Sequence, residues 1–151
     1  MIWAPRVTVA AVIERDHRFL MVEELHEGRK VYNQPAGHLE SGESLIDAAI
    51  RETREETGWR FRPTAIIGIY RWVHSEKDVT YLRICFTGVG EGHDPGQPLD
   101  EGILQAPWLT RDELQRASQH LRSPLVLHCI DDYLAGRRYP LELYHDIAAA
   151  E

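Results

Sequence analysis

The segment Gly37–Trp59, GHLESGESLIDAAIRETREETGW, contains a helix with recognisable ends. Ser44 is a favourable N-cap, Asp47 follows three residues later in a capping-box pattern, and Gly58 is suited to end the helix. We therefore predict a helix over residues 44–57. At about 100° of rotation per residue, its core-facing stripe consists of Ile46, Ile50, Thr53 and Thr57.

The C-terminal half of this predicted helix gathers acidic residues on a side of its own. Glu52, Glu55 and Glu56 have i, i+3, i+4 spacing, so their side chains converge. The same strip is apolar two turns earlier, which predicts that the carboxylates point into a groove. The solvated face on the other side of the helix carries Asp47, Arg51 and Arg54.

Three neighbouring carboxylates need a positive partner. Like-charge pairs on a helix cost roughly 0.2–0.5 kcal/mol each, and the C-terminal end of a helix disfavours anions. A hard divalent cation bound by carboxylate oxygens offsets both effects, and Mg²⁺ or Mn²⁺ prefers such ligands. An isolated acidic helix face is more often simply solvated, so the wider sequence has to decide between the two interpretations.

The wider spacing resembles the Nudix hydrolase signature, Gly-x5-Glu-x7-Arg-Glu-U-x-Glu-Glu-x-Gly-U, in which U is a bulky apolar residue. Thr53 and Trp59 stand at the two U positions and are mild departures. The charged and glycine positions that match the signature are Gly37, Glu43, Arg51, Glu52, Glu55, Glu56 and Gly58.

The resemblance implies a role for each matching residue. The Gly37 carbonyl and the carboxylates of Glu52, Glu55 and Glu56 would hold the Mg²⁺ ion, with Mn²⁺ as a possible substitute. Glu43 would pair with Arg51, which then orients the ligands without binding the metal itself. Glu52 is the first candidate for the general base, and Glu55 is the second.

Sequence outside the signature is similar to one group of phosphatases within the Nudix family. The similar runs are VTVAAVIE, FLMVEE, NQPAGHLE, LRSPLV and RYPLE. This similarity implies a monomer that releases orthophosphate from nucleoside di- and triphosphates and from thiamine-related diphosphates, such as hydroxymethylpyrimidine diphosphate and thiamine diphosphate.

The remaining chain predicts an α+β fold. RVTVAAVIE, RFLMVEE, WRFRPTAIIGIYRWVH, VTYLRICFTGVG and ILQAPWL indicate strands, while QPAGHLESGE and EGHDPGQPLDEG indicate loops. TRDELQRAS predicts a short helix capped by Thr110, and SPLVLHCIDDYLAG predicts another capped by Ser123. The final residues, from Arg137, give no clear prediction. The Nudix resemblance implies a mixed β-sheet sandwiched between helices, and we expect a single domain over residues 1–151.

Several residues outside the signature are candidates for substrate binding. Arg83 lies in an apolar strand, where it predicts either a phosphate contact or a structural ion pair. Trp72 and Tyr81 are able to stack on a substrate ring or to pack in the core, and Gln34 and His38 flank Gly37. Secondary candidates are Asp100 and Glu101 as further metal ligands or bases, and Arg122, Ser123 and Tyr139 near the last helix.

Composition excludes several classes of protein. The formal net charge of −7 over 151 residues argues against a nucleic-acid or membrane surface. Cys85 and Cys129 lie in apolar runs and predict reduced, packed thiols. The N-terminal apolar run is too short for a signal peptide or a membrane span, so we expect a cytoplasmic protein.

Two alternatives to an orthophosphate-releasing enzyme remain open. One is a pyrophosphohydrolase that cleaves between the α and β phosphates and yields NMP plus pyrophosphate. The other is a Nudix domain that binds its ligand without hydrolysing it, although no acidic residue of the signature is missing.

Overall fold

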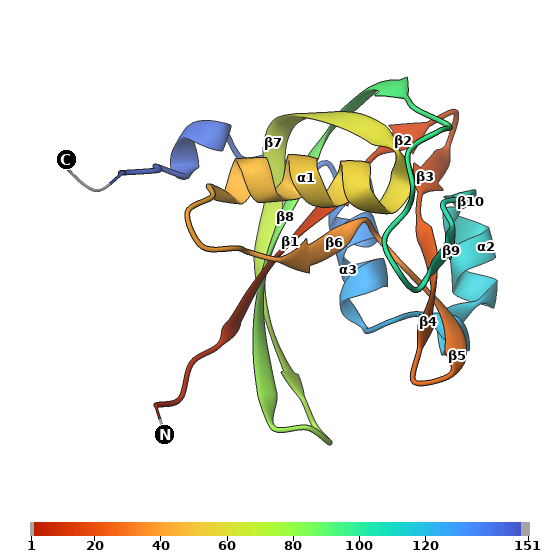
Figure 1. Cartoon of the computed structure of the whole chain (residues 1–151), viewed down its shortest axis with the longest axis horizontal. Helices are drawn as coiled ribbons and strands as arrows, with labels where there is room; N and C mark the ends of the chain where they lie inside the picture. The colour runs from red at the N-terminus through yellow and green to blue at the C-terminus, as the bar shows by residue number, and fades with distance from the viewer. Residues whose placement is uncertain (1, 149–151) are drawn as a thin grey trace.

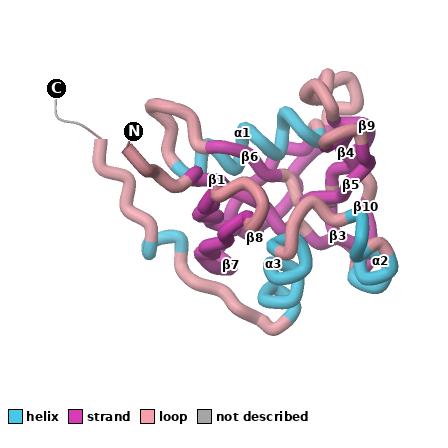
Figure 2. Tube along the Cα trace, turned by 90° about the horizontal axis from the view of Figure 1, so that it is seen from below, coloured by secondary structure: helices cyan, strands magenta, loops and turns pink. Residues whose placement is uncertain are grey.

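The computed structural model describes residues 2–148. Its centre is a mixed four-stranded sheet of β6 (Ala36–His38), β1 (Arg6–Val12), β8 (Val79–His93) and β7 (Trp59–His74), in that order. β1 and β8 run parallel, whereas the other neighbours are antiparallel. Helix α1 (Leu45–Thr57) lies on one face and α3 (Leu125–Leu134) on the other (Figures 1 and 2). The predicted α+β fold with helices on both faces is confirmed.

The alternation of residues along β1 explains why both faces are covered. Val9 and Ala11 belong to a core that contains Ala48 and Ala49 of α1. Their neighbour Ala10 belongs to a second core, which includes residues of α3. Successive side chains of a strand point to opposite faces, so a strand that is apolar at every position must be buried on both sides.

Two three-stranded sheets flank the central sheet. The first sheet has the order β10 (Trp108–Thr110), β3 (Arg18–Leu20) and β2 (Glu14–Arg15). The second sheet has the order β5 (Arg29–Asn33), β4 (Val22–His26) and β9 (Ile103–Gln105). The predicted single strands RVTVAAVIE, RFLMVEE and ILQAPWL are therefore each divided between two sheets. In the last run, Pro107 has no N–H for a ladder, and its carbonyl accepts the N–H of Met21 at 2.8 Å where the strands separate.

Both predicted ends of α1 are confirmed. The Ser44 hydroxyl accepts the N–H of Asp47 at 3.0 Å, and Gly58 adopts a left-handed conformation with φ of 76°. Thr53 is fully buried because its hydroxyl donates to the carbonyl of Ala49 at 2.8 Å. The predicted stripe is only partly correct, since Ile46 and Ile50 are half-buried while small alanines make the closest contact with the sheet.

The shorter helices follow their capping signals to different degrees. Thr110 and Glu113 form a complete capping box at α2 (Arg111–Arg116). The predicted N-cap Ser123 of α3 was wrong by one residue, because Pro124 is the N-cap and the helix begins at Leu125. The Ser123 hydroxyl still accepts the Leu125 N–H at 3.2 Å. Short 3-10 turns occupy Ser118–His120 and Leu141–Leu143.

Three further details bear on the predictions. The predicted loop around Gly37 contains a short strand, β6, and β8 extends to His93, beyond its predicted end. Both cysteines are free and buried, as predicted. Within residues 2–148, none of the helices has the length and apolar character needed to cross a lipid bilayer.

Candidate active site

Gly37 brings the edge strand β6 against α1. It pairs with Val9 of β1, and a Cβ at position 37 would overlap the carboxylate of Glu52. The close approach of the two elements therefore requires the absence of a side chain. This packing, rather than an unusual backbone conformation, explains the glycine.

Glu56 attaches α1 to the same edge strand. Glu56 is 8% exposed, and its carboxylate accepts the N–H of Ala36 at 2.8 Å. Burial, together with a smaller effect of the neighbouring Glu52 carboxylate, raises the pKa of Glu56 to about 9 against the opposing effect of the Ala36 N–H. The protein thus holds a carboxyl group in a place where its charge is disfavoured unless a cation is present.

Glu52, Glu55 and Asp100 form a second acidic group beside it. One carboxylate oxygen from each lies within 4.8 Å of the others, and the Asp100 N–H donates to the Glu55 carbonyl at 2.9 Å. That hydrogen bond fixes the loop before β9 against the end of α1. Burial raises the pKa of Glu52 to about 6 and also raises the pKa of Asp100. Of the two secondary acidic candidates, the structure brings Asp100, and not Glu101, into this group.

This acidic group suits a hard divalent cation. All of its donors are carboxylate oxygens, which Mg²⁺ and Mn²⁺ prefer over nitrogen or sulfur. Glu56 does not belong to the group, because its carboxylate accepts the backbone N–H of β6 instead. The structure therefore places Glu56 outside the group of Glu52, Glu55 and Asp100, although Glu52 and Glu56 line the same cavity.

Arg51 lies over the acidic residues and not on a solvated face, so the prediction of its orientation was wrong. It donates to both oxygens of Glu43, at 3.0 and 2.7 Å, and to Glu52 at 2.8 Å and Glu55 at 3.2 Å. The hydrogen bonds to Glu43 raise the pKa of Arg51, and Arg51 lowers the pKa of Glu43. A single guanidinium thus donates hydrogen bonds to three carboxylates and forms an ion pair with a fourth, Glu40, at 3.5 Å, which leaves net negative charge at the end of α1.

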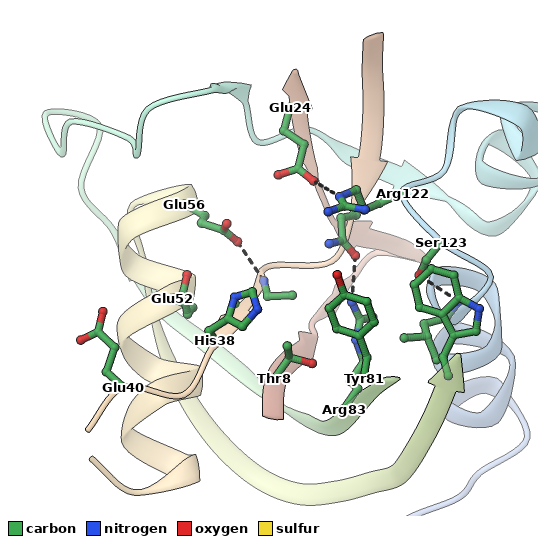
Figure 3. A pocket seen from close by; sticks show the side chains of 15 residues that line it. Thr8, Glu24, His38, Glu40, Glu52, Glu56, Tyr81, Arg83, Arg122 and Ser123 are labelled. Atoms are coloured by element: carbon green, nitrogen blue, oxygen red, sulfur yellow. Dashed lines mark hydrogen bonds and ion pairs between the residues drawn. The ribbon is translucent and has the colours of Figure 1, made fainter. Parts of the chain in front are cut away.

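A cavity of about 350 Å³ opens between α1 and the sheet. Figure 3 shows Glu52 and Glu56 on one side and Arg83, Arg122 and Tyr81 on the other. The two sides therefore carry opposite charge. A substrate that has both phosphate groups and an organic part is complementary to this cavity.

The register of the central sheet aligns several lining residues. Thr8 of β1 pairs with His38 of β6 on one side and with Arg83 of β8 on the other. All three line the cavity, so the predicted residues His38 and Arg83 are brought together. Burial lowers the pKa of His38, and Arg6 and Arg122 lower it further, which favours the neutral imidazole.

Trp72 and Tyr81 are cross-strand neighbours of β7 and β8. Their rings stack with centroids 5.5 Å apart and an interplanar angle of 20°, and both line the cavity. Both residues are half-buried, so the pair presents an aromatic surface to the cavity. Neither Trp72 nor Tyr81 belongs to either hydrophobic core.

Gln34 does not line the cavity. It is 1% exposed, donates to the Val126 carbonyl at 2.7 Å and accepts from Arg83 at 2.9 Å. It therefore lies behind Arg83. Arg122 and Ser123 line the cavity, whereas Tyr139 forms a bridge with Ile66 of β7 and is absent from the lining.

Sequence reasoning missed four polar lining residues, Thr8, Glu24, Asn33 and Glu40. Glu40 lies in the loop before α1. The other three lie on three different strands, and only the alternation of side chains along a strand hints at a shared face. Which strand positions meet depends on long-range pairing, and the sequence has no local signal for that.

Comparison with known proteins gives a consistent result. A family model described as NUDIX domain matches residues 4–128. The chain is 44% identical over 142 residues to Phosphatase NudJ of Shigella boydii serotype 4 (strain Sb227) and of Escherichia coli (strain K12), covering 94% of this chain and 92% of each relative. Its structure is similar to a NUDIX hydrolase from Nitrosomonas europaea, with a TM-score of 0.94, 48% identity and coverage of 95% of this chain and 98% of that one.

Proposed function

This chain belongs to the Nudix hydrolase family, and we propose that it is a Mg²⁺-dependent phosphatase that releases orthophosphate from nucleoside di- and triphosphates and from thiamine-related diphosphates. The observation that carries the proposal is the group of Glu52, Glu55 and Asp100, of which Glu52 lines a cavity that has Arg83 and Arg122 on its far side. The 44% identity with Phosphatase NudJ supports a phosphatase of this kind.

We propose that the Gly37 carbonyl, Glu52, Glu55 and Glu56 hold Mg²⁺ or Mn²⁺, with Asp100 as a further ligand. A bound dication of this type polarises phosphate oxygens and makes a bound water more acidic. Glu56 enters the set only if it gives up its proton, because burial raises its pKa to about 9 in the metal-free protein. Metal binding and deprotonation of Glu56 are then coupled.

The chain itself supplies a proton acceptor and the means to orient it. Glu52 is the first candidate for the general base and Glu55 the second, because both lie in the acidic group and both accept from Arg51. Arg51 is in turn held by both oxygens of Glu43. Glu43 and Arg51 thus position the acidic residues, and the cost of ordering them is met before the substrate arrives.

The far side of the cavity supplies the substrate contacts. We propose that Trp72 and Tyr81 stack on the ring of a pyrimidine, purine or thiazole-bearing substrate. His38 and Arg83 line the same cavity as this aromatic pair, and their proposed role is to contact phosphate oxygens. Gln34 contributes through Arg83 and makes no substrate contact of its own.

Product identification tests the proposal. The protein is incubated with Mg²⁺ and GTP, GDP, thiamine diphosphate or hydroxymethylpyrimidine diphosphate, and orthophosphate and pyrophosphate are assayed separately. We expect GTP to give GDP and orthophosphate. Formation of GMP and pyrophosphate would instead identify the ordinary pyrophosphohydrolase activity.

A binding module without hydrolysis is distinguished in the same experiment. It would bind the nucleotide in calorimetry, and no product would form with any of the four substrates. Glu52→Gln, Glu55→Gln and Glu56→Gln variants then separate the two cases, because they abolish turnover in an enzyme and leave an inactive parent unchanged.

A further inference from the structure

Arg83 is a buried cation that is held only by uncharged groups. Its guanidinium donates to Gln34 at 2.9 Å and to Asn33 at 3.3 Å, and it lies 4.0 Å from the sulfur of Cys129. Arg83 is 5% exposed, and within residues 2–148 no carboxylate oxygen lies within 4.0 Å of it. Its Nε is the one buried side-chain nitrogen or oxygen of this range without a hydrogen-bond partner.

Such an arrangement is costly in the absence of a ligand. The free-energy cost of removing a charge from water is offset only by a well-placed opposite charge together with hydrogen bonds for the remaining donors. Arg51 shows the usual solution in this same protein, since it donates to three carboxylates. Arg83 has neutral acceptors but no ion-pair partner of its own. Burial raises the pKa of Glu24, which also lines the cavity, and Arg122 and Arg83 lie near enough to oppose that rise. The Glu24 carboxylate, however, pairs with Arg122 at 3.5 Å. Two buried or half-buried cations thus share one carboxylate, and an anion from outside would offset the remaining positive charge.

The cavity brings an anion to this position. Arg83 lines it together with Arg122 and Ser123, and the N-terminus of the ten-residue helix α3 lies beside them at Leu125. A helix N-terminus favours negative charge. Within the described part of the chain, Arg122 forms a single ion pair, with Glu24 at 3.5 Å, which leaves the other N–H groups of its guanidinium available. Figure 3 shows this group across the cavity from Glu52 and Glu56.

We propose that Arg83 is the centre of a phosphate subsite that works without metal and binds the phosphate next to the one that is hydrolysed. The inference rests on the proposed function. With the substrate ring against Trp72 and Tyr81, the inner phosphate lies on Arg83 and the terminal phosphate faces the acidic residues of α1. The substrate class is then an aromatic compound with at least two linked phosphates, and the monophosphate product is a competitive inhibitor.

Asn33 and Gln34 gain a defined role from this proposal. They are positioning residues that fix the guanidinium while leaving its charge uncompensated. A carboxylate at either place would satisfy Arg83 internally and compete with the phosphate. Asn33→Asp makes this change with almost no change in volume, because the amide oxygen already accepts from Arg83.

The test measures the binding of a monophosphate in EDTA. GMP and inorganic phosphate are titrated into the wild-type protein by calorimetry, and GMP is then titrated into Arg83→Met, Asn33→Asp and the control Arg71→Met, which alters an exposed arginine of β7. We expect the wild type to bind GMP without metal. Arg83→Met and Asn33→Asp should weaken binding by about 10- to 100-fold, as expected for a hydrogen bond to a charged group, and Arg71→Met should have no effect.

Several outcomes would overturn the subsite. GMP binding that requires Mg²⁺ would do so, as would GMP binding that is unchanged in Asn33→Asp, which retains Arg83. Should Arg83→Met fail to fold, as seen in its thermal unfolding, Asn33→Asp decides alone. Failure of the proposed function looks different, because the wild type would then bind GMP in EDTA and form no product from diphosphates in Mg²⁺.

Discussion

The two sides of the cavity handle charge in opposite ways. On α1, the acidic residues lie side by side on one helix, and Arg51 offsets part of their charge. On the sheet side, Arg83 donates only to neutral acceptors, and the nearby carboxylate of Glu24 pairs with Arg122. One side has excess negative charge and the other has an unmatched positive charge, so each is incomplete without a ligand of opposite sign.

This difference suggests a division of labour. In the proposed function, the acidic side binds a cation that contacts a phosphate, while the cationic side binds phosphate directly. A substrate that contacts both sides completes both at once. Because each side carries a cost in the ligand-free protein, substitutions that remove a charge should impair function and leave the fold intact.

The largest expected effect comes from the acidic side. Glu52→Gln keeps the shape of the side chain and removes its charge and its capacity to accept a proton, so kcat should fall by about 100- to 10,000-fold. Steady-state release of orthophosphate measures the loss. Asp47→Asn is the matched control, since Asp47 is exposed on the same helix, and it should retain wild-type activity. Equal losses in both variants would contradict the assignment.

The acidic side could be predicted from the sequence because its information is local. The spacing of Glu52, Glu55 and Glu56 follows from helical periodicity, and both caps of α1 are encoded by neighbouring residues. The orientation of Arg51 depends on Glu43, which lies outside the helix. Helical periodicity alone placed Arg51 on the solvent side, whereas the Nudix resemblance paired Arg51 with Glu43, and the structure contains that pair.

The cationic side could be predicted only as a set of unconnected candidates. Arg83 was conspicuous as a charge in an apolar strand. Asn33 and Arg122 line the same cavity, but they come from segments that are distant in the sequence, and strand pairing and the chain before α3 bring them there. The same limitation explains the divided strands. A run such as RFLMVEE indicates a buried strand, but it does not indicate which sheet each half of the run joins.

The next prediction tests the contact between β6 and α1. Gly37→Ala places a methyl group where the Glu52 carboxylate lies. The flexible end of Glu52 is able to move, so the fold should survive while affinity for Mg²⁺ or Mn²⁺ falls by about 10- to 100-fold, as for other changes that misorient metal ligands. Calorimetric titration with Mn²⁺ gives the affinity, and circular dichroism gives the fold.

Gly92→Ala provides the control for that substitution. Gly92 lies on β8 and has no atom within 4 Å of the position its Cβ would take. It should bind metal as the wild type does. An unchanged Mn²⁺ affinity in Gly37→Ala would show that the Glu52 carboxylate is not a ligand in its present position.

A smaller effect concerns the stability of the metal-free protein. Burial raises the pKa of Glu56 from its ordinary value of 4.5 to about 9 in the folded state. Between about pH 4.5 and pH 9, the unfolded chain binds fewer protons than the folded protein does. Stability should therefore fall as pH rises through this window, by on the order of 1–2 kcal/mol between about pH 5 and 7. Glu56→Gln should flatten the dependence.

Urea unfolding in EDTA at several pH values measures this slope. Glu76→Gln, an exposed glutamate in the turn between β7 and β8, is the control and should leave the slope unchanged. Added Mg²⁺ should stabilise the wild type more at pH 8 than at pH 6, because the metal favours the ionised carboxylate. A slope that is the same in Glu56→Gln as in the wild type would show that Glu56 is already ionised without metal.

The smallest effect separates ring binding from phosphate binding on the cationic side. Trp72→Leu removes one of the two stacked rings, and a stacking contact of about 0.5–1.5 kcal/mol corresponds to a rise of about 2- to 10-fold in KM for GDP. Inorganic pyrophosphate has no ring, so its inhibition constant should not change. If the inhibition constant rises with KM, Trp72 acts by supporting Arg83 and its neighbours, and the aromatic pair belongs to the framework of the phosphate subsite.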